Sequence, residues 1–152
     1  MKKRLKPLKR HPKLIPLSRQ HHQGLILAQL LKNDVPDYKG LPTTPSGKLE
    51  YTQALFEQTL FPHFKKEEEI LIPMIKGYSS TLDSLSQQIL SEHQTIKTLF
   101  DDLSQQDESE LPDALDTLGR QIEAHIRFEE RQFFPKIQQE VPEEILEKLT
   151  LD

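Results

Sequence analysis

Residues 63–73 read HFKKEEEILIP, and residues 125–135 read HIRFEERQFFP. Each stretch begins with a histidine, has glutamates at the fourth and fifth positions after it, and has a proline ten residues after it. A spacing of four places two side chains on one face of a helix. The sequence therefore predicts two helices, in which His63 with Glu67, and His125 with Glu129, reach the same small volume.

Outward from these stretches, helical periodicity dominates the chain and strand-like alternation is nearly absent. Turn-forming residues separate the periodic segments. We predict an all-α fold, an antiparallel up-down four-helix bundle with a short C-terminal helix that caps one end. The expected helices cover residues 17–32, 48–76, 82–103 and 113–139, and the short helix lies near 142–149.

The apolar positions of these helices form the stripes that bundle helices bury. Histidine and glutamate occupy stripe positions where leucine is expected, and this anomaly requires an explanation. In the second helix the predicted stripe is Phe56, Leu60, His63, Glu67, Ile70 and Met74; in the third it is Leu82, Leu85, Ile89, His93, Ile96, Phe100 and Leu103; in the fourth it is Leu111, Leu115, Leu118, Ile122, His125 and Glu129.

The first helix offers two adjacent histidines. The stripe through His21 contains Leu17, Gly24, Ala28 and Leu31, whereas the stripe through His22 contains Ser18, Leu25, Gln29 and Lys32. The first is the apolar one, and its small residues permit close approach of a neighbouring helix. We therefore predict that His21 faces the interior and that His22 lies at the margin.

The two halves of the chain thus repeat one pattern: a lone histidine, His21 or His93, precedes a helix with His-x-x-x-Glu. Burial of such groups without partners costs several kcal/mol each, against a typical net stability of about 5–15 kcal/mol. Two cations would remove this cost if each were bound by two imidazoles and both were bridged by the two glutamates. Without metal, burial leads us to expect carboxylates that resist ionisation and histidines that resist protonation.

The donor set favours some metals and one kind of site over others. Imidazole with carboxylate suits iron, manganese or zinc better than calcium or magnesium. Di-iron bundles of the ferritin-like class use Glu-x-x-His. Here the order is reversed and histidine outnumbers glutamate, which argues against that class.

Composition limits the remaining function classes. The chain has 152 residues, net charge −4 and no cysteine, as expected for one domain in a reducing compartment. No apolar run approaches the ~18 residues of a membrane span. We expect a cytoplasmic protein that binds neither nucleic acid nor membrane.

The chain begins with MKKRLKPLKRHPKL, which contains seven Lys and Arg residues and no apolar stretch of the kind a signal peptide needs. We interpret residues 1–13 as a solvated basic tail and residues 14–152 as the domain. The alternative is a contact with phosphate or anionic membrane. His11 falls in this tail and is not expected to bind metal.

Four stretches together resemble the hemerythrin-like family, also called the HHE cation-binding domain: LSRQHHQGLILA, LFPHFKKEEEILIP, SEHQTIKTLF and HIRFEERQFFP. The resemblance covers about residues 14–139. It implies a non-haem pair of iron ions, oxo- or hydroxo-bridged, in preference to zinc or manganese. The ligands that it implies are His21, His63, Glu67, His93, His125 and Glu129, with the two glutamates bridging.

Two positions depart from the oxygen-carrying hemerythrins. Those proteins have a second histidine where this chain has Lys97, and their last carboxylate matches Glu130 rather than Glu129. The pattern is more similar to the branch with four histidines and two glutamates.

This branch includes bacterial proteins implicated in the repair of iron centres and in NO chemistry. Our first hypothesis is a di-iron protein that binds O2 or NO at open iron positions, or senses iron or redox state. The alternatives are a di-iron oxidoreductase that consumes peroxide or NO, or repairs iron centres, and a structural zinc-binding bundle. No motif indicates a redox partner, and the motifs leave open whether the protein is an enzyme.

Overall fold

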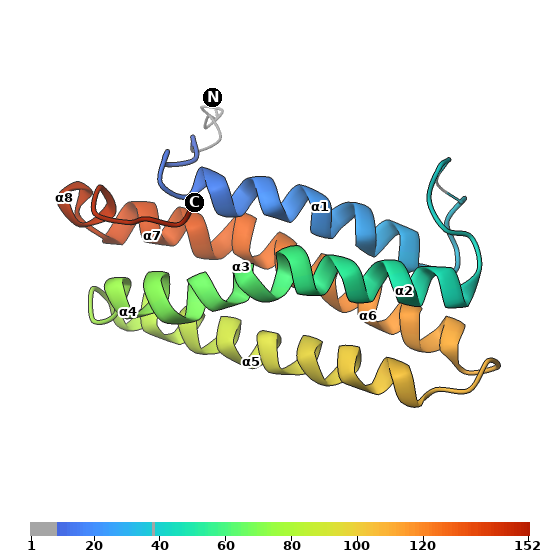
Figure 1. The fold of residues 1–152 in the computed structure, drawn as a ribbon. Helices are drawn as coiled ribbons and strands as arrows, with labels where there is room; N and C mark the ends of the chain where they lie inside the picture. Colours follow the sequence, from blue (N-terminus) through green and yellow to red (C-terminus); the bar gives the residue numbers. More distant parts are fainter. Residues whose placement is uncertain (1–8, 38) are drawn as a thin grey trace, which may run out of the picture.

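The computed structural model describes residues 9–37 and 39–152. Over these ranges the chain is helical and contains no strand, so the predicted all-α class is confirmed. The helices pack lengthwise as a bundle (Figure 1). Four long helical runs are followed by one short helix: α1 (Ile15–Leu31); α2 (Pro45–Leu55), η1 (Phe56–Leu60), α3 (Phe61–Lys66), η2 (Glu67–Leu71) and α4 (Ile72–Ile75); α5 (Ser80–Asp102) and η3 (Leu103–Gln105); α6 (Leu111–Phe128), η4 (Glu129–Phe133) and α7 (Phe134–Glu140); and α8 (Glu143–Leu146).

Helix starts follow local capping chemistry. The Thr44 hydroxyl accepts a hydrogen bond from the Gly47 amide, and Pro45 occupies the first turn, where its missing N–H costs nothing. This helix therefore begins three residues before the position that apolar periodicity suggested. Ser79 caps α5 in the same way, by accepting from the Leu82 amide at 3.0 Å.

Three turns of π-helix, η1, η2 and η4, interrupt the long runs, and each ends two residues before a proline. The residue before Pro73 donates its amide to the Glu67 carbonyl, five residues back, and the residue before Pro135 donates likewise to Glu129. The wider turn accommodates a proline ring that would clash with an α-helical carbonyl.

The π-turn η2 corrects the predicted stripe of the second run. Ile70 is exposed and Met74 is only partly buried, whereas Leu71 and Ile75 are buried. The extra residue in the turn shifts the phase of the helix by one position after Glu67. The other predicted stripes hold: their members are buried, apart from Leu85 and Phe100, which are partly buried.

The buried apolar residues form two clusters along the bundle. One includes Leu27 and Ile122, and the other includes Leu17 and Phe133. The predicted polar positions on each run lie between residues of these two clusters. The short helix α8 joins the second cluster through Leu146, as expected of a capping helix.

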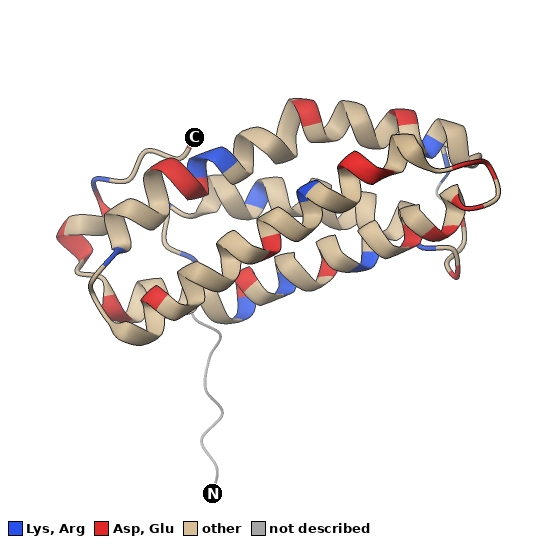
Figure 2. Ribbon diagram, turned by 90° about the horizontal axis from the view of Figure 1, so that it is seen from below, with Lys and Arg blue, Asp and Glu red and all other residues tan. Residues whose placement is uncertain are grey.

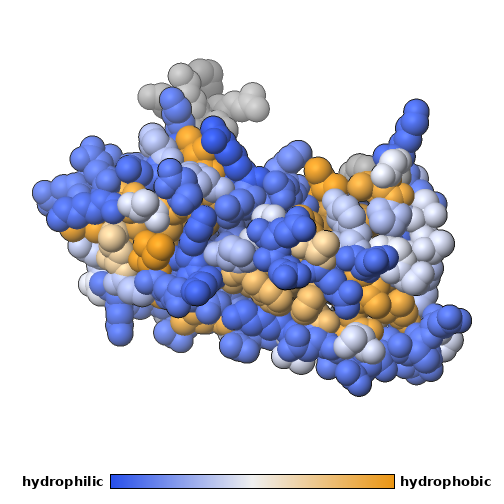
Figure 3. Space-filling view, viewed as in Figure 1, coloured by the Kyte–Doolittle hydropathy of each residue, from blue (hydrophilic) through white to orange (hydrophobic). Residues whose placement is uncertain are grey.

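The surface is largely hydrophilic, with apolar residues visible between polar ones (Figure 3). Lysine and arginine are interspersed with aspartate and glutamate along the helices (Figure 2). In the part of the chain that the structure describes, no helix is long and apolar enough to cross a membrane.

Most of the predicted basic tail lies outside the described residues, which begin at residue 9. Arg10 donates to the carbonyl and the carboxylate of Glu130, and His11 pairs with Glu143 at 2.8 Å. The domain boundary at residue 14 stays a prediction.

A close approach of α1 to α6 gives a test of the packing. A Cβ atom on Gly119 would lie 2.9 Å from the Ala28 carbonyl oxygen, a backbone atom that cannot move freely. We expect Gly119→Ala to destabilise the metal-free protein by about 1–2 kcal/mol, because overpacking outweighs the gain in helix propensity. Thermal unfolding should show a Tm lower by about 2–8 °C.

Gly24→Ala is the matched control, since the added methyl group meets the flexible end of Ile126 instead of backbone. A smaller loss is expected there. An unchanged or raised Tm for Gly119→Ala would contradict the close contact.

Candidate metal centre

Six buried side chains from the four long runs meet in the interior of the bundle. Their potential metal-binding atoms form two groups of four, and within each group all atoms lie within 4.8 Å of one another. We name these groups the first position and the second position. The first position comprises His21, His63, Glu67 and Glu129, and the second comprises His93, His125, Glu67 and Glu129.

The two positions share both glutamates, and this sharing places them side by side. Each glutamate lies one turn beyond a histidine of its own run, at the start of a π-turn. All six residues are at most 4% exposed. The structure therefore brings together every residue that the sequence singled out as a ligand.

Only part of the hydrogen-bonding capacity of this cluster is satisfied within the protein. His21 Nε2 lies 2.9 Å from Glu129 Oε1, and His93 Nε2 lies 3.1 Å from Glu67 Oε1. His63 Nε2 approaches Glu67 Oε1 only to 3.3 Å, and His125 Nε2 approaches Glu129 Oε1 to 3.5 Å, neither with hydrogen-bond geometry.

Four buried atoms of the cluster consequently have no hydrogen-bond partner among the described residues: His63 Nε2, His125 Nε2, Glu67 Oε2 and Glu129 Oε2. Buried polar atoms are nearly always satisfied, and each exception needs an explanation. Two imidazole nitrogens and two carboxylate oxygens that converge are suitable donors for a transition-metal cation. The residues present therefore fit a metal centre.

The outer nitrogen of each histidine is held by a second set of side chains. The four Nδ1 contacts are His21 to Glu130 at 2.6 Å, His63 to Gln20 at 2.7 Å, His93 to Glu68 at 2.6 Å and His125 to Glu92 at 2.7 Å. An ionised carboxylate or an amide oxygen only accepts, so Nδ1 carries the proton in each pair. Such contacts fix the ring and direct Nε2 inward.

The protonation expected from burial alone is wrong for His21, His63, His93 and Glu67. Burial lowers the pKa of His21, but hydrogen bonds to Glu129 and Glu130 outweigh it and raise the pKa to about 10. The pKa values of His63 and His93 are also raised, since carboxylates overcome the effect of burial. Burial raises the pKa of Glu67, yet the nearby histidines bring it well below its usual range. Imidazolium–carboxylate pairs thus form without metal.

The candidates left outside the cluster have other roles. His22 is exposed, as its stripe predicted. Glu130 points to the outer nitrogen of His21 and also accepts from the Ser18 hydroxyl at 2.8 Å. Lys97 Nζ lies 3.4 Å from Glu68 Oε2.

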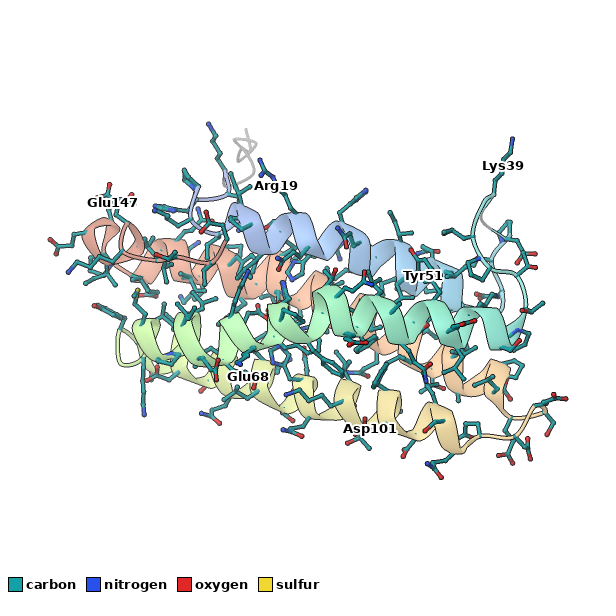
Figure 4. The ribbon with its side chains drawn as sticks, in the orientation of Figure 1. Arg19, Lys39, Tyr51, Glu68, Asp101 and Glu147 are labelled. Atoms are coloured by element: carbon teal, nitrogen blue, oxygen red, sulfur yellow. The ribbon has the colours of Figure 1, made fainter. Side chains whose placement is uncertain are left out.

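Sequence reasoning missed the four outer acceptors, although the chain carries a signal for them. Glu68 and Glu130 are the second glutamates of the two repeated motifs, and Gln20 and Glu92 directly precede the lone histidines. Figure 4 labels Glu68 beside α5, the helix that carries His93. Gln20 and Glu92 therefore contact a histidine on another helix, rather than the histidine beside them in sequence.

The fold and the site together define a helical bundle with a buried cation-binding centre. The family model of the hemerythrin HHE cation-binding domain matches residues 13–137. The chain belongs to this family. Searches of curated proteins and of solved structures gave no significant match.

The raised histidine pKa values predict how the metal-free protein responds to pH. A group whose pKa is raised on folding adds stability below its unfolded value, about 6.5, and this stability is lost as pH rises toward its folded value, about 10 for His21. The lowered pKa of Glu67 adds stability above about 4.5. We expect the Tm of the metal-free protein, measured in chelator, to fall between about pH 6.5 and 9.

The slope of this decline should become shallower in His21→Gln and stay unchanged in His22→Gln, because only His21 is paired with carboxylates. A Tm that rises over the same range would show that the histidines are neutral when metal is absent.

Proposed function

We propose that the chain is a non-haem di-iron protein, with one iron at each position and Glu67 and Glu129 shared between them. The observation that carries this proposal is the set of four unpartnered buried atoms, two nitrogens and two oxygens. One nitrogen belongs to each position, and the second oxygen of each shared carboxylate is free. A single cation at one position would leave the two histidines of the other position without metal.

The same proposal includes the arrangement of the helices. We infer an antiparallel up-down order for the four runs, which is supported by the short connection of residues 76–79 between α4 and α5. Contacts of α1 and α5 with α6 support it as well. In this order the repeated halves of the chain face each other across the two positions.

The surroundings of the histidines favour a small ligand. The Phe64 ring stacks on His93 with centroids 4.1 Å apart, and the Phe134 ring stacks on His21 at 5.5 Å. These rings and the two apolar clusters exclude bulk water and large substrates from the ligands. An iron pair would supply redox chemistry and coordination positions left open by the protein. We therefore propose O2 or NO as the class of molecule that binds.

Metal analysis after iron-supplemented expression tests the metal assignment. We expect close to two irons per chain. His21→Ala and Glu129→Ala should each lower the amount of bound iron, because each removes a donor atom. The outer contacts hold the remaining histidine rings in place, so these rings cannot easily move to replace the lost donor. His22→Ala is the control for His21→Ala and should retain the iron of the unaltered protein.

One tightly bound zinc without a second metal would overturn the di-iron assignment in favour of a structural zinc site. For the loaded protein, reversible change of the visible spectrum with O2 or NO supports ligand binding. Catalytic consumption of NO or peroxide would instead identify an oxidoreductase.

A further inference from the structure

The outer acceptors repeat with the two halves of the chain. Glu130 contacts the lone histidine of the first half, His21, and Glu68 contacts that of the second half, His93. Glu130 and Glu68 are each the second glutamate of a motif. The counterparts Gln20 and Glu92 break the repeat, because one is a neutral amide and the other is a carboxylate.

These acceptors divide between the two positions. In the first position, one histidine contacts the carboxylate of Glu130 and the other contacts the amide of Gln20. In the second position, both histidines contact carboxylates, those of Glu68 and Glu92. The outer contacts are equally short at both positions, so the difference is one of charge rather than of geometry.

Nearby cations do not cancel this difference. Arg10 lies 3.2 Å from Glu130, and Lys97 lies 3.4 Å from Glu68, so each position has one carboxylate with a basic partner. The second oxygen of Glu92 accepts from the neutral amide of Gln88 at 2.9 Å. In the part of the chain that the structure describes, no lysine or arginine pairs with Glu92. The second position therefore has one more uncompensated negative charge.

We propose that the two positions are inequivalent, with the second position binding metal more tightly and Gln20 making the first position the weaker one. This inference rests on the proposed function. An imidazole whose outer N–H donates to a carboxylate is a stronger electron donor than one bonded to an amide, and loss of such a contact typically weakens metal binding about 10–100-fold. The charge of Glu92 adds to the attraction for a cation.

A consequence follows for the behaviour of the site when iron is scarce. The second position fills first and empties last, and the first position is occupied only at higher metal concentration. Gln20 thereby sets the metal concentration at which the pair becomes complete. The occupied fraction of the first position, which has a single outer carboxylate contact, then depends on how much metal is available.

Anaerobic binding isotherms of the metal-free protein with Fe2+, and with Co2+ as a spectroscopic probe, test the proposal. We expect two steps of one ion each, with affinities that differ by about 10-fold or more. His63→Ala should remove the weaker step, and His125→Ala should remove the tighter one. These two variants assign the steps to the positions.

Two nearly isosteric substitutions then test the outer residues. Gln20→Glu should tighten the weaker step by about 10-fold and bring the two steps together. Glu92→Gln should weaken the tighter step by a similar factor. Gln23→Glu, on the same helix but exposed and bonded to Thr59, and Glu69→Gln, exposed next to Glu68, are the matched controls and should leave both steps unchanged.

The outcomes distinguish a failure of the proposed inequivalence from a failure of the proposed di-iron function. Fewer than two bound ions per chain would overturn the proposed di-iron function. Two bound ions with equal affinities that Gln20→Glu and Glu92→Gln leave unchanged would overturn the inequivalence alone. Far-UV circular dichroism of each variant checks that it folds. If the control variants change the metal affinities as much as Gln20→Glu and Glu92→Gln do, then general charge, rather than the histidine contact, sets the affinity.

Discussion

The structure depends on the burial of six ionisable side chains in one layer between two apolar clusters. A charge removed from water must be paired and hydrogen-bonded if the fold is to tolerate it. The bundle meets part of this requirement, on both the inner and the outer side of the histidine rings. Inside, carboxylates of Glu67 and Glu129 face the histidine Nε2 atoms; outside, four further side chains accept from the Nδ1 atoms. The phase of the helices, the positions of the prolines and the outer Nδ1 acceptors all help to place these six side chains.

The fold class could be read from the sequence because apolar stripes and capping residues are local signals. The prediction failed where one turn changed its hydrogen bonding. At Glu67 the helix widens into a π-turn, and the buried positions move from Ile70 and Met74 to Leu71 and Ile75. Periodicity assumes a constant number of residues per turn, so it cannot register such a shift. The proline ten residues after His63 and after His125 is a local sequence signal for these π-turns, because each turn ends two residues before it.

The six inner residues could be singled out because two motifs and two lone histidines coincided in the apolar stripes. The outer residues could not, because their roles depend on which helices are neighbours. Gln20 sits beside His21 in sequence, yet it accepts from His63 of another helix. The same dependence explains the error in protonation. Burial alone penalises charge, whereas the packed helices place a carboxylate against each histidine and reverse the direction for His21, His63 and His93.

The raised histidine pKa values change what is expected of the metal-free protein. Sequence reasoning treats the buried charges as tolerable only with cations, but the structure pairs imidazolium with carboxylate and so lets protons take the place of metal. A metal ion would then compete with protons at His21, His63 and His93, so we expect its affinity to rise with pH. Four atoms nevertheless stay unpartnered, so the protonated cluster is incompletely satisfied. The cluster is therefore partly paired by its own carboxylates, and the four unpartnered atoms are the ones that a cation would satisfy.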